Sequence, residues 1–120
     1  MIEILPDYPD NVLAITASNN ITGEDYESVI IPAIEAKLET HGKVRMLYHL
    51  GPEFTGFDAA AMWEDAATGL KHFTDFEKIA FVSDVDWINH MVSAFGFMIP
   101  CPVKVFSGGK LSEASEWIKS

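Results

Sequence analysis

The sequence predicts an α/β fold in a single domain over residues 1–120, with five strands and four helices. Segments of strand character alternate with segments of helical periodicity, which is the pattern of an α/β domain. The run Ile79–Val82 is apolar without alternation, as in a central strand covered on both faces. A chain of 120 residues with 48% hydrophobic side chains suits one compact core.

Five short segments have the composition of strands. They are residues 2–5, 12–18, 44–50, 78–83 and 102–106. Residues that favour turns separate the first two segments, and Gly51 with Pro52 predicts the end of the third.

The first predicted helix has clear boundary signals. Thr22 with Asp25 three residues later forms a capping-box pattern, so the helix is expected to begin there. Gly42 is the expected end, because glycine is common just beyond helices. Pro32 lies inside the segment and predicts either a bend or the loss of the first turn.

Three more helices are predicted. The second follows the candidate caps Thr55 and Asp58 and runs to about residue 72. Its expected inward positions are Ala59, Met62, Ala66, Leu70 and Phe73. The third is expected to be capped by Asp84 or Asp86, and the fourth covers residues 112–119.

The segment from Trp87 to Val103 contains no Asp, Glu, Lys or Arg, in a chain whose formal net charge is -10. On a helical wheel most of its large apolar residues share one arc, and the opposite arc is polar but uncharged. Two interpretations remain open. Either the arc packs on the sheet as ordinary core, or it forms an exposed apolar patch that binds a ligand, a membrane or a partner.

Soft and amphipathic side chains support the second interpretation, because Met adapts to variable apolar groups and Trp suits a surface that is apolar on one side and wet on the other. The candidate ligand or membrane patch comprises Met62, Trp63, Trp87, Met91, Phe95, Phe97, Met98 and Ile99. We expect residues 59–73 and 87–99 to face each other across a mostly apolar cleft.

No catalytic motif identifies a reaction, so the sequence favours binding over catalysis. His49, Thr55, Asp84 and His90 are possible polar site residues. Ser83 with His49 and Asp84 could form a hydrolytic relay, but the Gly-x-Ser-x-Gly turn that would present the serine is missing. The four histidines lack the spacing of metal ligands, so no metal or cofactor is expected.

The charge balance and the ends of the sequence restrict the partners. Eighteen acidic against eight basic residues disfavour nucleic-acid binding, because phosphate backbones are repelled. The charge-free segment is too short to span a bilayer, and the N-terminus does not resemble a signal peptide. Cys101 has no second cysteine to pair with. We therefore expect a cytoplasmic protein that can associate peripherally with membranes.

The order of elements and several short motifs resemble the SpoIIAA-like (STAS/SEC14-type) family of small bacterial proteins. The matching residues are Thr22, Glu24, Asp25, Tyr26, Pro32, Phe57, Trp63, Glu64, Asp65, Ile79, Ala80, Val82, Asp84, Trp87, Phe106, Glu113, Ala114 and Trp117. The resemblance spans nearly the whole chain and implies a mixed five-stranded sheet.

The resemblance implies two kinds of function. Relatives of SEC14 type suggest a lipophilic small molecule or a membrane surface as the partner. Relatives that antagonise anti-sigma factors suggest a regulatory protein-interaction domain that can form a homodimer. Those antagonists carry a phosphorylated serine in an Asp-Ser-Ser-Gly turn, where this sequence has only Thr55 as a counterpart.

Overall fold

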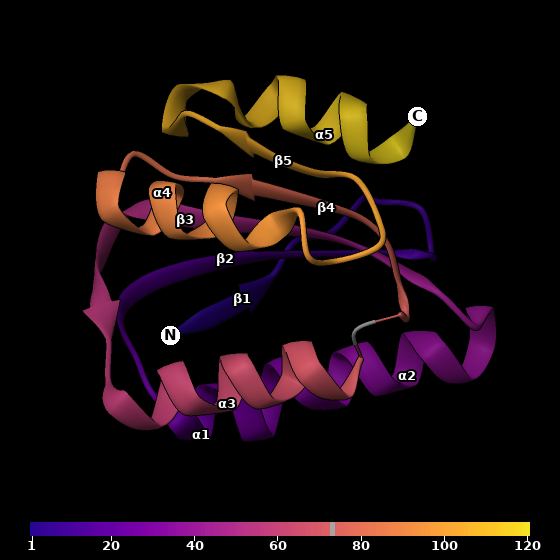
Figure 1. Ribbon diagram of the computed structural model, residues 1–120, viewed down its shortest axis with the longest axis horizontal. Helices are drawn as coiled ribbons and strands as arrows, with labels where there is room; N and C mark the ends of the chain where they lie inside the picture. Colours follow the sequence, from indigo (N-terminus) through magenta and orange to yellow (C-terminus); the bar gives the residue numbers. More distant parts are fainter. Residues whose placement is uncertain (73) are drawn as a thin grey trace.

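The computed structural model describes residues 1–72 and 74–120, with all of their side chains except that of Leu70. Five strands form one mixed sheet in the order β1-β2-β3-β4-β5 (Figure 1). β1 pairs antiparallel to β2, and the other neighbouring strands are parallel. The strands are β1 (Ile2–Ile4), β2 (Val12–Ile21), β3 (Val44–Phe57), β4 (Phe76–Val82) and β5 (Val103–Phe106).

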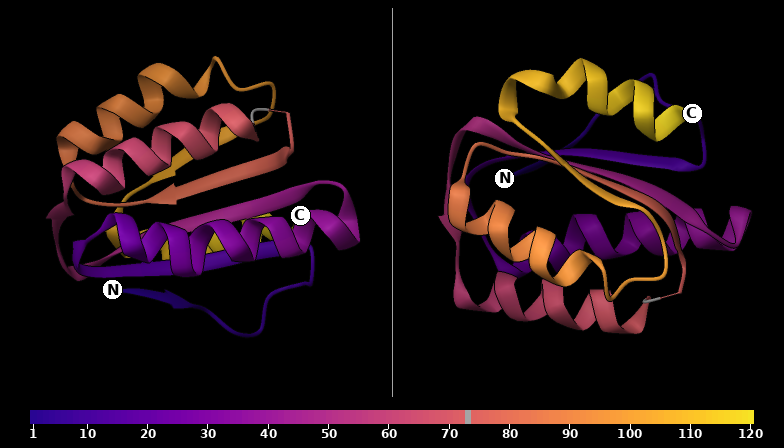
Figure 2. Two further views of the ribbon diagram at one scale, coloured as in Figure 1. Left: turned by 90° about the horizontal axis from the view of Figure 1, so that it is seen from below. Right: turned by 45° about the horizontal axis from the view of Figure 1, so that its top comes forward.

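The helices cover the two faces of the sheet unequally. They are α1 (Gly23–Asp25), the π-helical turn η1 (Tyr26–Ile30), α2 (Ile31–His41), α3 (Ala59–Lys71), α4 (Asp86–Gly96), the 3-10 turn η2 (Gly108–Lys110) and α5 (Leu111–Lys119). α1, η1 and α2 form one continuous helix, so the described residues contain the predicted four helices. Figure 2 shows α2, α3 and α4 beside one another on one face, with α5 on the other.

The first helix has the boundaries that its sequence predicts. Thr22 accepts a hydrogen bond from the Asp25 amide, and the Asp25 carboxylate accepts one from the Thr22 amide. Gly42 ends the helix with a positive φ of 73°, which glycine adopts without strain. The helix passes Pro32 without ending, because it widens into the π turn η1 just before the proline, which has no N–H to donate.

β3 does not end at Gly51 and Pro52 as predicted but continues to Phe57. Its pairing with β4 stops at His49, so the last part of β3 has only β2 as a neighbour. The pairing register with β2 shifts between Leu50 and Phe54, and Pro52 falls in that irregular stretch. A proline is tolerated there because it interrupts no regular ladder.

The predicted caps of two helices need correction. Asp58 alone caps α3, by accepting a hydrogen bond from the Ala61 amide, and Thr55 lies in the strand instead. α4 begins after Val85 without a side-chain cap, so neither Asp84 nor Asp86 caps it.

Two hydrophobic cores lie on opposite faces of the sheet. Tyr26, Ile34 and Met46 belong to the core under α2, α3 and α4, whereas Leu47 and Ile118 belong to the core under α5. Alternate residues of β3 point to opposite faces, because side chains alternate along a strand. No helix of the described residues is long and apolar enough to cross a membrane.

Candidate functional site

An apolar cleft of about 500 Å³ lies between α3, α4 and the sheet. Its volume falls within the range of small-molecule sites. Ten of its side chains come from the first helix and the sheet: Tyr26, Ile30, Ile34, Met46, Tyr48, Phe57, Phe76, Ile79, Phe81 and Val103. The two helical segments predicted to face each other across a cleft therefore do so, although Phe73 lies outside the described residues.

The cleft exists because α3 packs mainly against the first helix and presents small side chains to the space beside α4. Ala61 is fully buried, and Gly23 approaches Ala60 so closely that a Cβ on Gly23 would lie 2.8 Å from the Ala60 Cβ. Ala66 and Gly69 line the cleft without filling it. Of the predicted inward positions, Met62 and Ala66 line the cleft, Ala59 is exposed, and the side chains of Leu70 and Phe73 lie outside the described part of the chain.

α4 supplies the opposite wall and is only partly packed on the sheet. Ile88 is buried, and Gly96 lies against Val103 of β5, where a Cβ would be 3.1 Å from Val103 Cγ1. Trp87, Met91 and Phe95 line the cleft yet remain 54%, 40% and 60% exposed. One edge of α4 is therefore core and another is accessible, so the described charge-free segment is neither entirely buried nor entirely exposed.

Three hydrogen-bonded side chains form a polar site in this apolar wall. The Tyr26 hydroxyl donates to Asp65 Oδ1 over 2.7 Å and lies 2.9 Å from the Tyr48 hydroxyl. Because the proton of Tyr26 points at Asp65, Tyr48 must donate to Tyr26. Both tyrosines are almost completely buried, whereas Asp65 is accessible through the cleft.

Burial controls the protonation of all three groups. It raises the pKa of both phenols, and the nearby Asp65 charge raises that of Tyr26 further, so both remain donors at neutral pH. Partial desolvation raises the pKa of the Asp65 carboxyl, while the hydrogen bond from Tyr26 opposes that rise. The Asp65 side chain is nevertheless exposed in the cleft, and contact with solvent favours its charged form.

Comparison with known proteins supports the predicted family. The SpoIIAA-like family model matches residues 12–119. The chain belongs to the SpoIIAA-like family. The structure is similar to that of an uncharacterised DUF3478-family protein with a SpoIIAA-like fold from Shewanella loihica PV-4, at 26% identity and a TM-score of 0.77. The match covers 98% of this chain and 92% of the other. Among curated proteins, none matches the sequence.

The residues predicted to form the patch divide into two groups in this SpoIIAA-like domain. Five of them line the cleft: Met62, Trp87, Met91, Phe95 and Ile99. The other three, Trp63, Phe97 and Met98, are exposed outside the cleft. Phe97 follows α4 and is 82% exposed, and Trp63 lies on α3 and is 72% exposed. The predicted patch thus consists of a cleft wall and separate surface residues.

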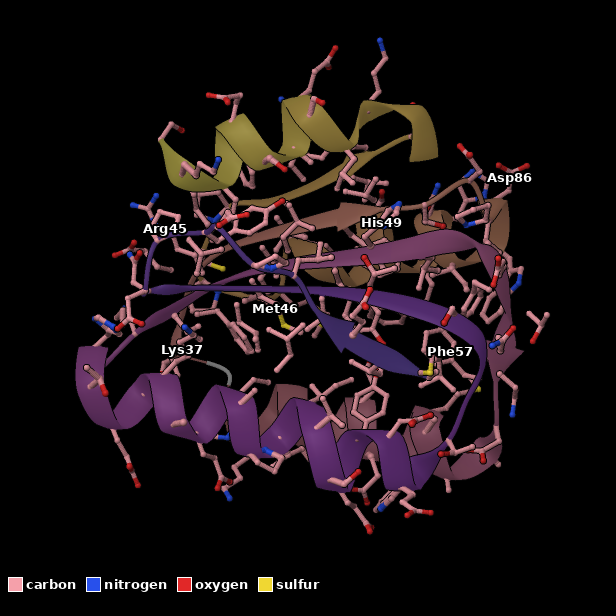
Figure 3. The ribbon with its side chains drawn as sticks, turned by 180° about the vertical axis from the view of Figure 1, so that it is seen from behind. Lys37, Arg45, Met46, His49, Phe57 and Asp86 are labelled. Atoms are coloured by element: carbon pink, nitrogen blue, oxygen red, sulfur yellow. The ribbon has the colours of Figure 1, made fainter. Side chains whose placement is uncertain are left out.

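The four predicted polar residues do not line the cleft. His49 points toward α5, on the opposite side of β3 from Met46 (Figure 3). Its Nδ1 lies 3.2 Å from Thr16 Oγ1, and burial lowers its pKa. Thr55 and His90 are exposed. Asp84 accepts a hydrogen bond from the Gly108 amide and so ties the end of β4 to the start of η2.

The suggested relay of Ser83, His49 and Asp84 is not assembled. Ser83 Oγ accepts a hydrogen bond from the Val85 amide, and no hydrogen bond among the described residues joins the three side chains. The described residues also contain no group of three His, Cys, Asp or Glu side chains that could hold a metal ion.

Sequence reasoning missed Tyr26, Tyr48 and Asp65 as site residues. Tyr26 fits an apolar helix face, and Tyr48 lies beside the buried residues Met46 and Leu47 of β3. An acidic residue on a helix rich in alanine is typical of a solvated surface. A signal was nevertheless available, since Asp65 follows Met62 by three positions and therefore shares its helix face.

Proposed function

We propose that this SpoIIAA-like domain is a non-enzymatic binding domain that takes a lipophilic small molecule into the cleft between α3 and α4. The observation that carries the proposal is the accessible apolar wall of Trp87, Met91 and Phe95 beside a cleft of about 500 Å³. Folding has left these side chains partly in water, which costs roughly 25 cal/mol for each Å² of apolar surface. An apolar ligand would remove that surface from water.

The character of the walls supports an adaptable ligand site. Met46, Met62 and Met91 contribute unbranched side chains that fit ligands of varied shape. Trp87 can pack its ring on an apolar chain while its indole N–H stays near solvent. Most other lining residues are aliphatic or aromatic, so polar recognition is confined to a few atoms.

A fluorescence titration with the neutral apolar probe N-phenyl-1-naphthylamine tests the proposal. Ala66 lines the cleft, whereas its exposed neighbour Ala67 does not. Ala66→Trp should fill the cleft and weaken probe binding at least tenfold, and the matched control Ala67→Trp should bind like the native chain. Equal affinity in all three proteins, or no binding to the native chain, contradicts the proposal.

Peripheral membrane association is a second candidate, favoured by the exposed side chains outside the cleft. Phe97 and Met98 follow the last turn of α4 and are 82% and 57% exposed. Insertion of such residues into a bilayer interface needs no basic surface, which suits a chain with a net charge of -10. A regulatory protein-interaction domain that can form a homodimer is the alternative that would use the same exposed residues.

A further inference from the structure

The cleft contains one charged side chain among its described lining residues, and that side chain is Asp65. Its Oδ1 accepts the hydrogen bond from Tyr26, whereas its Oδ2 has no hydrogen-bond partner in the described part of the chain. The carboxylate is accessible from the cleft. It can therefore contact the polar end of a bound molecule.

The hydrogen bonds around Asp65 determine what that polar end must offer. Tyr48 donates to Tyr26 and Tyr26 donates to Asp65, so neither phenol proton points into the cleft. Each phenol has only one proton to donate. An ionised carboxylate only accepts hydrogen bonds, so the three groups together present acceptor oxygens and a negative charge.

We propose that the ligand is an amphiphile whose polar end donates a hydrogen bond to Asp65, such as a primary ammonium or a hydroxyl group, and that anionic lipids such as fatty acids are disfavoured. This inference rests on the proposed ligand-binding function. The Ala66–Gly69 segment of α3 leaves room beside Asp65, and the aliphatic and aromatic walls hold the hydrocarbon chain.

Electrostatics favours the same selection. A carboxylate head beside Asp65 would place two negative charges together in surroundings of low dielectric constant, where repulsion is stronger than in water. The net charge of -10 adds to that repulsion at longer range. An ammonium head gains a charge-assisted hydrogen bond, which is stronger than a bond between neutral groups.

Displacement of N-phenyl-1-naphthylamine from the native chain at pH 7.5 tests the inference with four ligands of similar length. Decylammonium should bind at least tenfold more tightly than decanoate. 1-Decanol should bind at least fivefold more tightly than 1-methoxynonane, an ether that accepts but cannot donate. Decanoate binding as tightly as decylammonium, or the ether as tightly as the alcohol, overturns the inference.

Two variants separate the effect of Asp65 from the effect of overall charge. Asp65→Asn and Glu64→Gln each remove one negative charge from neighbouring positions of α3, but only Asp65 lines the cleft. The ratio of the affinity for decylammonium to the affinity for decanoate should fall at least fivefold in Asp65→Asn and stay unchanged in Glu64→Gln. Equal preferences in both variants overturn the inference.

The inference and the proposed function fail in different ways. If the apolar probe and all four ligands fail to bind, the ligand-binding function itself is wrong. If they bind without head-group preference, only the role of Asp65 is wrong. The ligand series on the native chain decides this point even if Asp65→Asn does not fold.

Discussion

The Tyr26 hydroxyl donates to Asp65 Oδ1 over 2.7 Å and thereby joins the first helix to α3 across the cleft wall. Tyr26 is buried in the core, whereas Asp65 faces the open cleft. The bond thus connects the packed part of the molecule to its accessible part. It holds Asp65, the one charged side chain among the described residues that line the cleft, in a defined orientation.

Removing the charge of Asp65 should stabilise the domain at neutral pH. The folded-state pKa of Asp65 is raised, so the folded chain binds a proton more readily there than the unfolded chain does. The contribution of Asp65 to the free energy of unfolding therefore decreases as pH rises above about 4, the ordinary pKa of an aspartate. Asp65→Asn, whose amide oxygen can still accept from Tyr26, should be more stable than the native chain at pH 7.

The gain in the free energy of unfolding of Asp65→Asn should be about 1 kcal/mol or less, because the carboxylate is partly solvated. Urea unfolding at pH 7 and at pH 3.5 measures it, and the difference between the two proteins should shrink at the lower pH. A native chain that is the more stable at pH 7 would contradict the assignment of Asp65 as a partly desolvated carboxylate.

Loss of the Tyr26 hydroxyl, in the middle of the hydrogen-bonded chain, should destabilise the domain more than loss of the Tyr48 hydroxyl at its end. Tyr26→Phe leaves both the Tyr48 hydroxyl and Asp65 Oδ1 without their partner, which costs roughly 1–3 kcal/mol. Tyr48→Phe removes only the terminal donor and should cost about 0.5–1.5 kcal/mol. Chemical unfolding of the two variants tests the order, and a larger loss in Tyr48→Phe would contradict the central position of Tyr26 in this hydrogen-bonded chain.

The distance between the first helix and α3 should depend on two small residues. Gly23→Ala places a Cβ 2.8 Å from that of Ala60, so one helix must move. We expect a loss of about 1–3 kcal/mol, as for other overpacked contacts. Ala60→Gly alone should cost about 1 kcal/mol through helix propensity.

Combining these two substitutions gives an internal control. Ala60→Gly removes the atom that the Gly23→Ala side chain meets, so the double variant should be more stable than the sum of the single losses predicts. Thermal unfolding of the four proteins completes the cycle. Strict additivity would show that the contact does not set the position of α3.

The sequence predicted those parts of the fold that depend on local chemistry. Thr22 with Asp25 and Gly42 act through neighbouring backbone atoms, so their patterns identify the helix ends without knowledge of the rest. The extension of β3 was missed because Gly51 and Pro52 indicate a turn by local rules. Pairing with β2 alone, in an irregular register, overrides that preference.

The site was predicted only in its apolar part, because that part carries a compositional signal. The absence of charge between Trp87 and Val103 identified the α4 wall. Asp65 could not be distinguished from a surface acid, since its environment depends on how far α3 stands from the sheet. α3 also packs against the first helix through the contact of Gly23 with Ala60, which no pattern in either segment reveals.

The proposed membrane association should depend on the exposed residues that follow α4. The double variant Phe97→Asp with Met98→Asp should lose flotation with neutral phosphatidylcholine liposomes, because charged residues do not insert into the interface. Adding anionic lipid should not increase flotation of the native chain. Equal flotation of both proteins would exclude these two residues as the anchor.

The most direct test of the ligand-binding cleft is native mass spectrometry of protein purified without detergent and incubated with a bacterial lipid extract. We predict a monomer carrying a small-molecule adduct for the native chain and for Ala67→Trp, and an adduct-free monomer for Ala66→Trp. The adduct should carry an amine or hydroxyl head rather than a carboxylate. An adduct on all three proteins, or on none, would contradict a ligand site between α3 and α4, and an adduct-free dimer would favour the partner-binding alternative.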